Sequence, residues 1–315
     1  MKNIWQFIGK NSWRSNRSFL IGLLAKTMKK KKGGAGQLRC MVGLIVPLVL
    51  LPVTSAKAIH LPKWELGFGA AVLGVPAYRG AKGQETVVLP VPFVAYRGER
   101  FKIDEEGMRG ELVHRNRLQL DFSVSGSLPV ANGAGAREGM PSLDPVGEAG
   151  PSLKIVLGQI GNRHKEWEQE WWIRLPIRAA LSVGDPLVGH QGWVFSPYVN
   201  WVWTKGKTRS LWRWSLSAGP IYASQVYHDY FYAVDQRYVT SSRPAYEAEA
   251  GYSGKRISLT LAVHSHKWFV GGFVRYDDLG GAVFEDSPLV ETKNYLAMGI
   301  VITRVFAHST ERVGH

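Results

Sequence analysis

The chain has 315 residues, one cysteine and a formal net charge of +14 at pH 7. The basic excess belongs to its first part: residues 1–58 carry 11 of the 39 Lys and Arg residues and none of the 25 Asp and Glu residues. The other 28 basic residues are almost balanced by 25 acidic ones, which excludes the basic face that nucleic-acid binding requires.

Residues 1–58 have the three parts of a secretory signal peptide. Met28 is followed by the basic run Lys29–Lys32, and a short apolar segment extends from Met41 to Val53. The end, Ala56-Lys57-Ala58, has the small-x-small pattern of a cleavage site. Because the apolar segment is too short to cross ~30 Å of hydrocarbon as a helix, it predicts a cleaved signal rather than an anchor.

We expect translation to start at Met28, cleavage after Ala58 and one domain over residues 59–315. Cys40 would leave with the leader, so the mature protein would contain neither a disulfide nor a thiolate metal site. An exported chain of this length is either a soluble β-sandwich or a barrel in the outer membrane.

Alternation of apolar and polar residues predicts β-strands along the mature chain. In its clearest form, Leu118, Leu120 and Phe122 alternate with Gln119 and Asp121. The predicted strands in chain order are Trp64–Gly74, Val87–Tyr96, Phe101–Val113, Asn116–Leu128, Gly147–Leu157, Trp171–Leu181, Trp193–Trp203, Trp212–Tyr222, Ala245–Tyr252, Ile257–Val263, Trp268–Tyr276 and Leu296–Phe306. The ring-rich segment Tyr227–Tyr232 is predicted as a loop.

The length of these strands favours a membrane barrel. Several run for about 9–13 residues, as tilted membrane strands do, whereas strands of soluble sheets average about 5–6. Trp and Tyr residues recur near the strand ends, where aromatic girdles meet the membrane interface. We therefore predict an all-β fold, a transmembrane antiparallel β-barrel of about 12 strands.

The segment Phe101–Val113 leaves two alternatives open. It is either one interrupted strand or a small hairpin, so a barrel of ten strands is also possible. Read as one strand, it places the loops Leu128–Gly147 and Gln225–Arg243 in the periplasm. Read as a hairpin, it moves both loops to the other side of the membrane.

Eight segments carry a family resemblance. Three of them are AGPIYAS (Ala218–Ser224), YHDYFYAV (Tyr227–Val234) and RPAYEAEAGYSG (Arg243–Gly254). The other five are LPVPFVAYRGERFKID (Leu89–Asp104), AREGMPSLDPVGEAGPSL (Ala136–Leu153), LPIRAALS (Leu175–Ser182), GWVFSPYVN (Gly192–Asn200) and GAVFEDSPLV (Gly281–Val290). In these segments, taken in chain order, the chain resembles the MipA/OmpV family of outer-membrane proteins. The resemblance implies an outer-membrane barrel. For some relatives it implies a scaffold joining a murein lytic transglycosylase to a penicillin-binding murein synthase, and for others adhesion, osmotic response or antibiotic binding.

The resulting expectation is a non-enzymatic scaffold in the Gram-negative outer membrane, in contact with lipid and without cofactor or metal. The alternative is a narrow channel, or a receptor or adhesin that binds small polar molecules or antibiotics. An outer-membrane lipid hydrolase is the third hypothesis. Phe306 ends the last strand, and residues 307–315 are predicted as a polar tail.

No residue set predicts catalysis or a metal site. His228 and Asp229 with Ser287 come nearest, since a nucleophile needs a base within hydrogen-bond reach. Ser287 precedes Pro288, however, and this pair is typical of a tight turn. His264 and His266 alone are too few for a zinc site.

Two loops carry charged groups among apolar ones, a combination that suits a partner or ligand surface. Their candidate residues are Arg137, Met140, Leu143, Asp144, His228, Asp229, Tyr230 and Arg243. The first of these loops could equally fold into the barrel as a plug.

The polar faces of the strands predict a charged network in the lumen. Its residues are Asp121, Arg174, Arg178, Arg213 and Glu249. They are assigned to the interior because arginine facing lipid at mid-depth costs about 2–4 kcal/mol. A paired network would fill the barrel, and an unpaired one would form an anion pathway.

Overall fold

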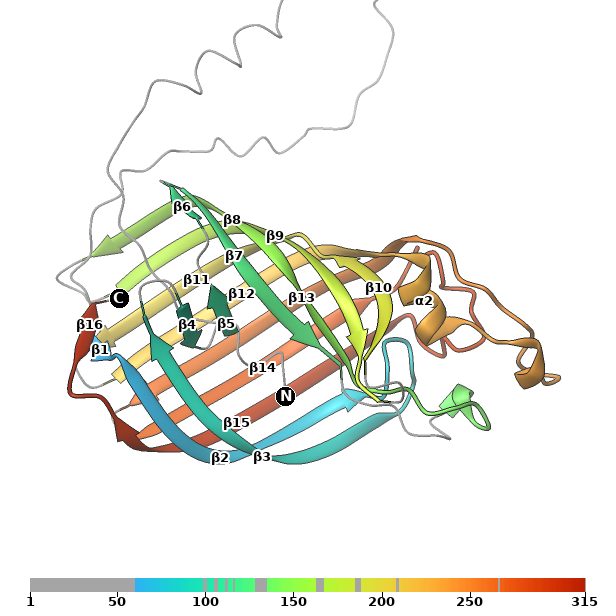
Figure 1. Ribbon diagram of the computed structural model, residues 1–315, viewed down its shortest axis with the longest axis horizontal. Coiled ribbons are helices and arrows are strands. Elements are labelled where there is room, and N and C mark those ends of the chain that lie inside the picture. Colours follow the sequence, from blue (N-terminus) through green and yellow to red (C-terminus); the bar gives the residue numbers. More distant parts are fainter. Residues whose placement is uncertain are drawn as a thin grey trace, which may run out of the picture.

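The computed structural model of the protein describes residues 60–314 apart from residues 99–100, 105–106, 111–112, 116, 128–134, 163–166, 185–187, 208–209 and 266. The described chain forms an antiparallel β-barrel whose strands tilt across its axis (Figure 1). The expected leader, the start at Met28 and the cleavage after Ala58 lie outside the described residues and stay predictions.

The strands follow the predicted segments closely. They are β2 (Trp64–Pro76), β3 (Gln84–Arg97), β4 (Phe101–Asp104), β5 (Gly107–Gly110), β6 (Val113–Arg115), β7 (Leu118–Gly126), β8 (Val146–Asn162), β9 (Trp167–Ser182), β10 (Gly189–Phe195), β11 (Tyr198–Lys207), β12 (Ser210–Ala223), β13 (Gly251–Ser265), β14 (Trp268–Asp278) and β15 (Asn294–His308).

Two of the barrel strands are interrupted. β5 pairs with β4 and β6 pairs with β7, both antiparallel, so β5 and β6 act as one strand between these neighbours. β10 and β11 each pair with β9 and β12, on either side of residues 196–197. With each interrupted strand counted once, the barrel has 12 strands, which confirms the predicted fold.

The barrel closes where β15 pairs with β2, from Met298 opposite Gly74 to His308 opposite Glu65. Along the wall, side chains alternate between lipid and lumen as predicted. Phe122 is 44% exposed on the outer face, whereas the neighbouring Asp121 is 0% exposed. Exposed aromatic residues lie near both ends of the strands, among them Trp212 and Trp268 at one end and Tyr222 and Tyr276 at the other.

The two ends of the barrel differ. Only a few residues separate β3 from β4, β8 from β9, β11 from β12, and β13 from β14. The strand ends that flank these short gaps lie at the end of the barrel that holds β1 (His60–Pro62) and β16 (Arg312–Gly314). The described parts of the long loops lie at the opposite end (Figure 1). Outer-membrane barrels have short periplasmic turns and longer extracellular loops, so β1 and β16 belong to the periplasmic end.

The hairpin reading of Phe101–Val113 is the one observed, because Phe101 pairs with Gly110 across the β4–β5 turn. This extra reversal puts the loop after β7 and the loop after β12 at the extracellular end.

The C-terminal tail is also more ordered than the predicted polar extension: β16 pairs with β1, and Lys63 forms a 3.0 Å ion pair with Glu311.

The loop after β12 corrects two predictions. Gln225–Tyr232 forms helix α2, with the His228 amide donating to the Ser224 carbonyl at 3.1 Å. The predicted strand Ala245–Tyr252 is wrong, and β13 begins only at Gly251. The backbone of this segment bonds to loop groups instead: Tyr246 exchanges hydrogen bonds with Val234, and the Ala248 amide donates to Asp229. The 3-10 turns η1 (Gly135–Arg137) and η2 (Gln236–Tyr238) lie in the same loop region.

Among the described residues, one seam of the wall, between β3 and β7, is only partly paired. On the side away from β2, the observed pairs of β3 are Tyr96 and Arg97 with β4, and on the side away from β8, β7 pairs with β6 only over its first three residues. The Gly98 amide donates to the Phe101 carbonyl, on the side of β3 that faces this seam. Every second residue before Gly98 in β3 therefore directs its backbone N–H position toward the seam. Pro90 and Pro92 occupy two such positions, where a residue without an N–H leaves no unpaired donor.

Candidate functional site

The described lumen contains paired charges. Arg174 on β9 forms a 3.2 Å ion pair with Asp121 on β7, and both side chains are buried. Trp172 lies beside them, with the Arg174 guanidinium 5.1 Å and the Lys154 ammonium 4.9 Å from its ring. Lys154 in turn lies 3.3 Å from Glu170. This part of the lumen is therefore occupied by side chains that neutralise one another.

Arg178 joins the wall to the loops. Its Nε lies 3.0 Å from Glu148 and its Nη2 donates to Ser196 at 2.8 Å. Glu148 also accepts a 3.1 Å hydrogen bond from the hydroxyl of Tyr227 on α2. The carboxylate thus links a strand arginine to the helix that covers the barrel mouth.

The two other residues of the expected network lie apart from these pairs. Arg213 is buried on β12, pairing in the ladder with Thr204 and Ala262. Glu249 lies outside the lumen, because the chain has not yet entered β13 at this position and the side chain is exposed. Its backbone carbonyl, rather than its carboxylate, has a structural role, described below.

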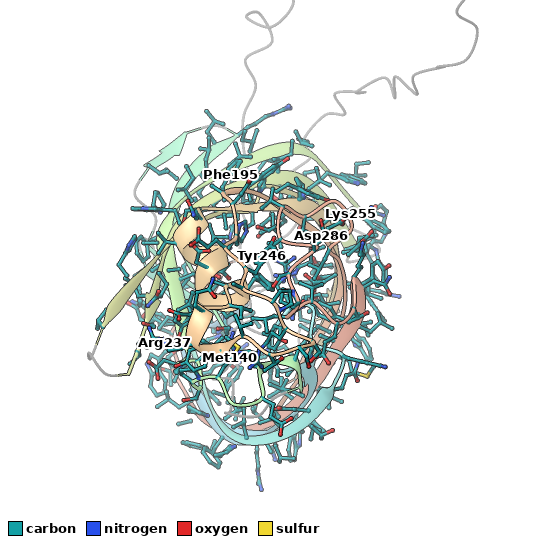
Figure 2. The ribbon with its side chains drawn as sticks, turned by 90° about the vertical axis from the view of Figure 1, so that its right-hand side faces the viewer. Met140, Phe195, Arg237, Tyr246, Lys255 and Asp286 are labelled. Atoms are coloured by element: carbon teal, nitrogen blue, oxygen red, sulfur yellow. The ribbon has the colours of Figure 1, made fainter. Side chains whose placement is uncertain are left out.

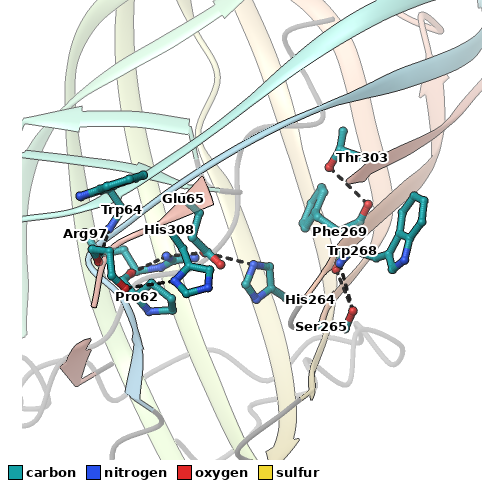
Figure 3. Close-up of polar contacts among 11 residues, drawn as sticks. Pro62, Trp64, Glu65, Arg97, His264, Ser265, Trp268, Phe269, Thr303 and His308 are labelled. Atoms are coloured by element: carbon teal, nitrogen blue, oxygen red, sulfur yellow. Dashed lines mark hydrogen bonds and ion pairs between the residues drawn. The ribbon is translucent and has the colours of Figure 1, made fainter. Parts of the chain in front are cut away.

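A second buried ion cluster lies at the periplasmic end and was not predicted. Arg97 Nη1 lies 2.7 Å from Glu65 Oε2 and also donates to the Pro62 carbonyl at 2.8 Å (Figure 3). His264 Nε2 lies 3.1 Å from the same Glu65 oxygen. Apolar side chains that include Phe93 and Phe269 pack beside this cluster in the lumen. Among the described residues, this end of the lumen is therefore filled.

At the extracellular end, α2 and the loops cover the barrel mouth (Figure 2). Met140 and Leu143, expected at a partner surface, are 4% and 7% exposed and belong to an apolar cluster with Phe231, Tyr232 and Phe284. We call this set of loop residues the mouth cluster.

Arginines tie the mouth cluster together. Arg137 is 4% exposed and donates to the Phe231 carbonyl at 3.1 Å. Burial lowers the pKa of Arg137, against the opposing effect of nearby Tyr78. Arg243 donates at 2.8 Å to the carbonyls of Ala136 and Glu138. Both arginines therefore hold loop backbone in place at the barrel mouth.

The remaining residues expected in a partner surface also make loop contacts. Asp229 accepts from the Ala248 amide at 2.8 Å, and the Tyr230 hydroxyl donates to the Asp144 carbonyl at 3.1 Å.

Close approach of α2 to the wall depends on Gly192 in β10, whose φ is 91°. A Cβ there would lie 2.1 Å from Ser224 Oγ, so only glycine fits.

His228 is enclosed at the centre of the mouth cluster. It is 0% exposed, lies 4.8 Å from the Phe284 ring, and its Nδ1 is 2.6 Å from the Glu249 carbonyl. Since a carbonyl only accepts, Nδ1 carries the proton and Nε2 accepts from the Ser253 hydroxyl. Burial lowers the pKa of His228, although the Glu249 carbonyl opposes this, so the ring is neutral at pH 7.

The Ser253–His228 pair resembles the nucleophile and base of a hydrolase, but both side chains are 0% exposed. A substrate therefore has no access to Ser253 in this arrangement. Ser287 donates instead to the Tyr232 carbonyl at 2.7 Å, and Ser287 is not among the described contacts of His228.

Within the described residues, no group of three or more His, Cys, Asp or Glu is placed to hold a metal ion.

Three arginines surround one carboxylate just beneath the mouth cluster. Asp277 on β14 is 0% exposed and lies 2.9 Å from Arg256, 3.0 Å from Arg275 and 3.4 Å from Arg79. Arg79 comes from the loop after β2 and also donates to the Ser253 carbonyl at 2.7 Å. Tyr295 is buried beside this set, and its hydroxyl has no hydrogen-bond partner among the described residues.

A cavity of about 390 Å³ lies between this arginine set and the mouth cluster. Its polar lining includes Arg79, Arg178, Arg256, Arg275 and Glu148. Its apolar lining comes from wall residues and from rings, among them Tyr227, Phe231, Tyr232 and Phe273. A smaller cavity of about 100 Å³ shares Arg178, Arg256 and Arg275 and adds the hydroxyl-bearing Ser217, Ser258 and Thr260.

No helix in the described part of the chain is long and apolar enough to cross a membrane.

The family model for MltA-interacting protein MipA matches residues 68–306. No curated protein sequence matches the chain. Two crystal structures of the Pseudomonas putida toluene transporter TodX align at 10% and 11% identity. They cover 79% and 78% of this chain and 68% of TodX, with TM-scores of 0.23 and 0.22.

Proposed function

We propose that this chain, which belongs to the MltA-interacting protein MipA family, is a non-enzymatic scaffold for murein enzymes. The family match carries the proposal, because it extends over the barrel from β2 to β15. The partner class that the family name suggests is a lytic transglycosylase. A penicillin-binding murein synthase is the second partner we propose, from the resemblance noted in the sequence.

The proposed docking surface is the periplasmic end, where murein enzymes work. It presents the β1–β16 ribbon, the exposed Lys63–Glu311 ion pair and the exposed Arg312. Ser309 fastens the ribbon to the barrel, because its amide donates to the Trp64 carbonyl at 2.9 Å. A fixed two-stranded ribbon outside the membrane offers backbone and charged groups to a partner without disturbing the wall.

The loop residues first considered for partner binding support a different role. Arg137, Met140 and Leu143 are buried at the extracellular end, where they cannot reach a periplasmic enzyme. Their contacts support a role in holding the mouth cluster. The burial of His228 and Ser253, together with the separate hydrogen bond of Ser287, supports a protein without hydrolase activity.

The scaffold proposal is tested by capture of a purified lytic transglycosylase on the full-length protein in detergent. Arg312→Glu reverses an exposed charge on β16 and should weaken capture. Arg237→Glu reverses a charge that is 70% exposed at the extracellular end, and it should have no effect. Failure of the wild-type protein to bind the enzyme would refute the scaffold. Equal capture by both variants and wild type would refute the β1–β16 surface.

A receptor for small molecules is the second candidate, and the cavity beneath the mouth cluster favours it. The paired charges and packed rings of the lumen favour a closed receptor over an open channel. Protein inserted in a planar bilayer should therefore show no stepwise conductance. Regular conductance steps from the wild-type protein would favour the channel instead.

A further inference from the structure

We infer that the cavity beneath the mouth cluster binds a small organic carboxylate, with the anion held by Arg79, Arg256 and Arg275 and its apolar part held by the surrounding rings. This goes beyond the scaffold function and does not depend on it. The inference is carried by the charge balance, by unused hydrogen-bond donors and by the shape and lining of the cavity.

The arginines that line the cavity outnumber the acidic groups they contact. Arg178 is matched by Glu148, but Arg79, Arg256 and Arg275 share the single carboxylate of Asp277. The three side chains are 16%, 31% and 12% exposed, so part of each faces the cavity rather than packed protein. Two positive charges are therefore left over in a site with restricted access to water, which favours binding of an anion.

Hydrogen-bond donors are also in excess. A guanidinium has five N–H donors, whereas the observed acceptors for these three arginines are the Asp277 carboxylate and the Ser253 carbonyl. Nε of Arg79 and Nε of Arg275 contact Asp277 at 3.4 and 3.0 Å, and the buried Tyr295 hydroxyl makes no hydrogen bond among the described residues. A bound carboxylate could accept from the free ends of two guanidiniums at once, as planar carboxylates do.

The apolar lining limits the ligand to an organic anion with a ring or a short aliphatic part. Tyr227, Phe231 and Tyr232 face the cavity from α2, and Phe273 faces it from β14. The volume, about 390 Å³, lies within the range of small-molecule sites, roughly 300–1,000 Å³. An inorganic ion would leave these rings uncovered, so the lining favours a carboxylate with an apolar body.

The test is isothermal titration of benzoate into the full-length protein in detergent, with benzamide as its neutral analogue. Arg275→Met removes one donor group and leaves Asp277 paired with Arg256 and Arg79. It should weaken benzoate binding roughly tenfold to hundredfold, as loss of a charge-assisted hydrogen bond does. Arg304→Met, an exposed arginine on β15 outside the cavity, is the matched control and should bind benzoate like the wild type.

Arg256→Met provides a second variant in case Arg275→Met does not assemble, and its expected loss of affinity is similar. Correct assembly is checked first, by the shift in gel migration that boiling causes. Wild-type binding of benzoate but not benzamide, lost in the cavity variants alone, supports the inference. No benzoate binding, equal binding of benzamide, or binding unaffected in both cavity variants overturns it. Inorganic phosphate that binds as tightly as benzoate would refute the organic carboxylate.

Discussion

Removing the Phe284 ring should open the mouth cluster while leaving the barrel intact. Phe284 is 0% exposed, and its ring stacks on Tyr232 with centroids 3.7 Å apart and an interplanar angle of 9°. It also lies 4.8 Å from the His228 ring, so one substitution removes the ring contacts of two α2 residues, His228 and Tyr232. Replacing a buried Phe by Ala costs about 3–5 kcal/mol.

This cost falls on the loops, because the strands are held by their own ladders. If α2 exchanges its amide hydrogens through local opening, the exchange rate should rise roughly a hundredfold to a few thousandfold in Phe284→Ala, since each 1.4 kcal/mol corresponds to about tenfold. Hydrogen exchange read by mass spectrometry on the peptide covering Gln225–Tyr232 measures it. Peptides from β15 should not change.

Phe306→Ala is the matched control, because that ring is 69% exposed on the lipid face and contributes nothing to the mouth cluster. Unchanged exchange of α2 in Phe284→Ala would refute the argument that these rings hold the loops. Faster exchange throughout the barrel would show instead that the loops and the wall unfold together.

Three further predictions concern the wall, the mouth cluster and the periplasmic end. Phe122→Arg should prevent formation of the heat-modifiable barrel, because arginine facing lipid costs about 2–4 kcal/mol at mid-depth, whereas Phe122→Leu should assemble. Burial lowers the pKa of His228 below its ordinary value of 6.5, so in acid the unfolded loop binds more protons than the folded loop. The mouth cluster should therefore lose stability as pH falls from 6.5 through the lowered pKa. Faster hydrogen exchange of α2 at pH 5 than expected from chemistry alone checks this, and His228→Gln should abolish the difference. Arg97→Met should cost about 3–5 kcal/mol in urea unfolding by leaving Glu65 without its arginine, and adding Glu65→Gln should restore most of that loss; a double variant as unstable as the single one would contradict it.

The wall could be predicted because its signal is local. Each strand has lipid on one side and lumen on the other, so neighbouring residues face different environments. The apolar Phe122 and the charged Asp121 are enough to assign the two faces of β7. The same alternation identified Asp121 and Arg174 as lumen residues. It could not show that they meet, because pairing depends on the positions of β7 and β9 around the barrel.

The loops were less predictable. Helix α2 has only eight residues, too few for a helical period to stand out, and Ser224 makes no side-chain cap hydrogen bond. The apolar groups Met140 and Leu143 read as a partner surface because nothing local indicates that distant loops cover them. The Asp277 set was missed for the same reason, since Arg79 lies on a loop far away in sequence and reaches Asp277 only once the barrel has closed.

The partly paired seam between β3 and β7 has a consequence for how the barrel comes apart. The terminal strands β2 and β15 are joined by a ladder that runs from Gly74 to Glu65, while the described residues at the seam pair only briefly, through β4 and β6. A closed sheet under thermal stress parts where the fewest backbone bonds must break together. Rupture should therefore begin between β3 and β7, and the terminal strands β2 and β15 should be among the last to separate.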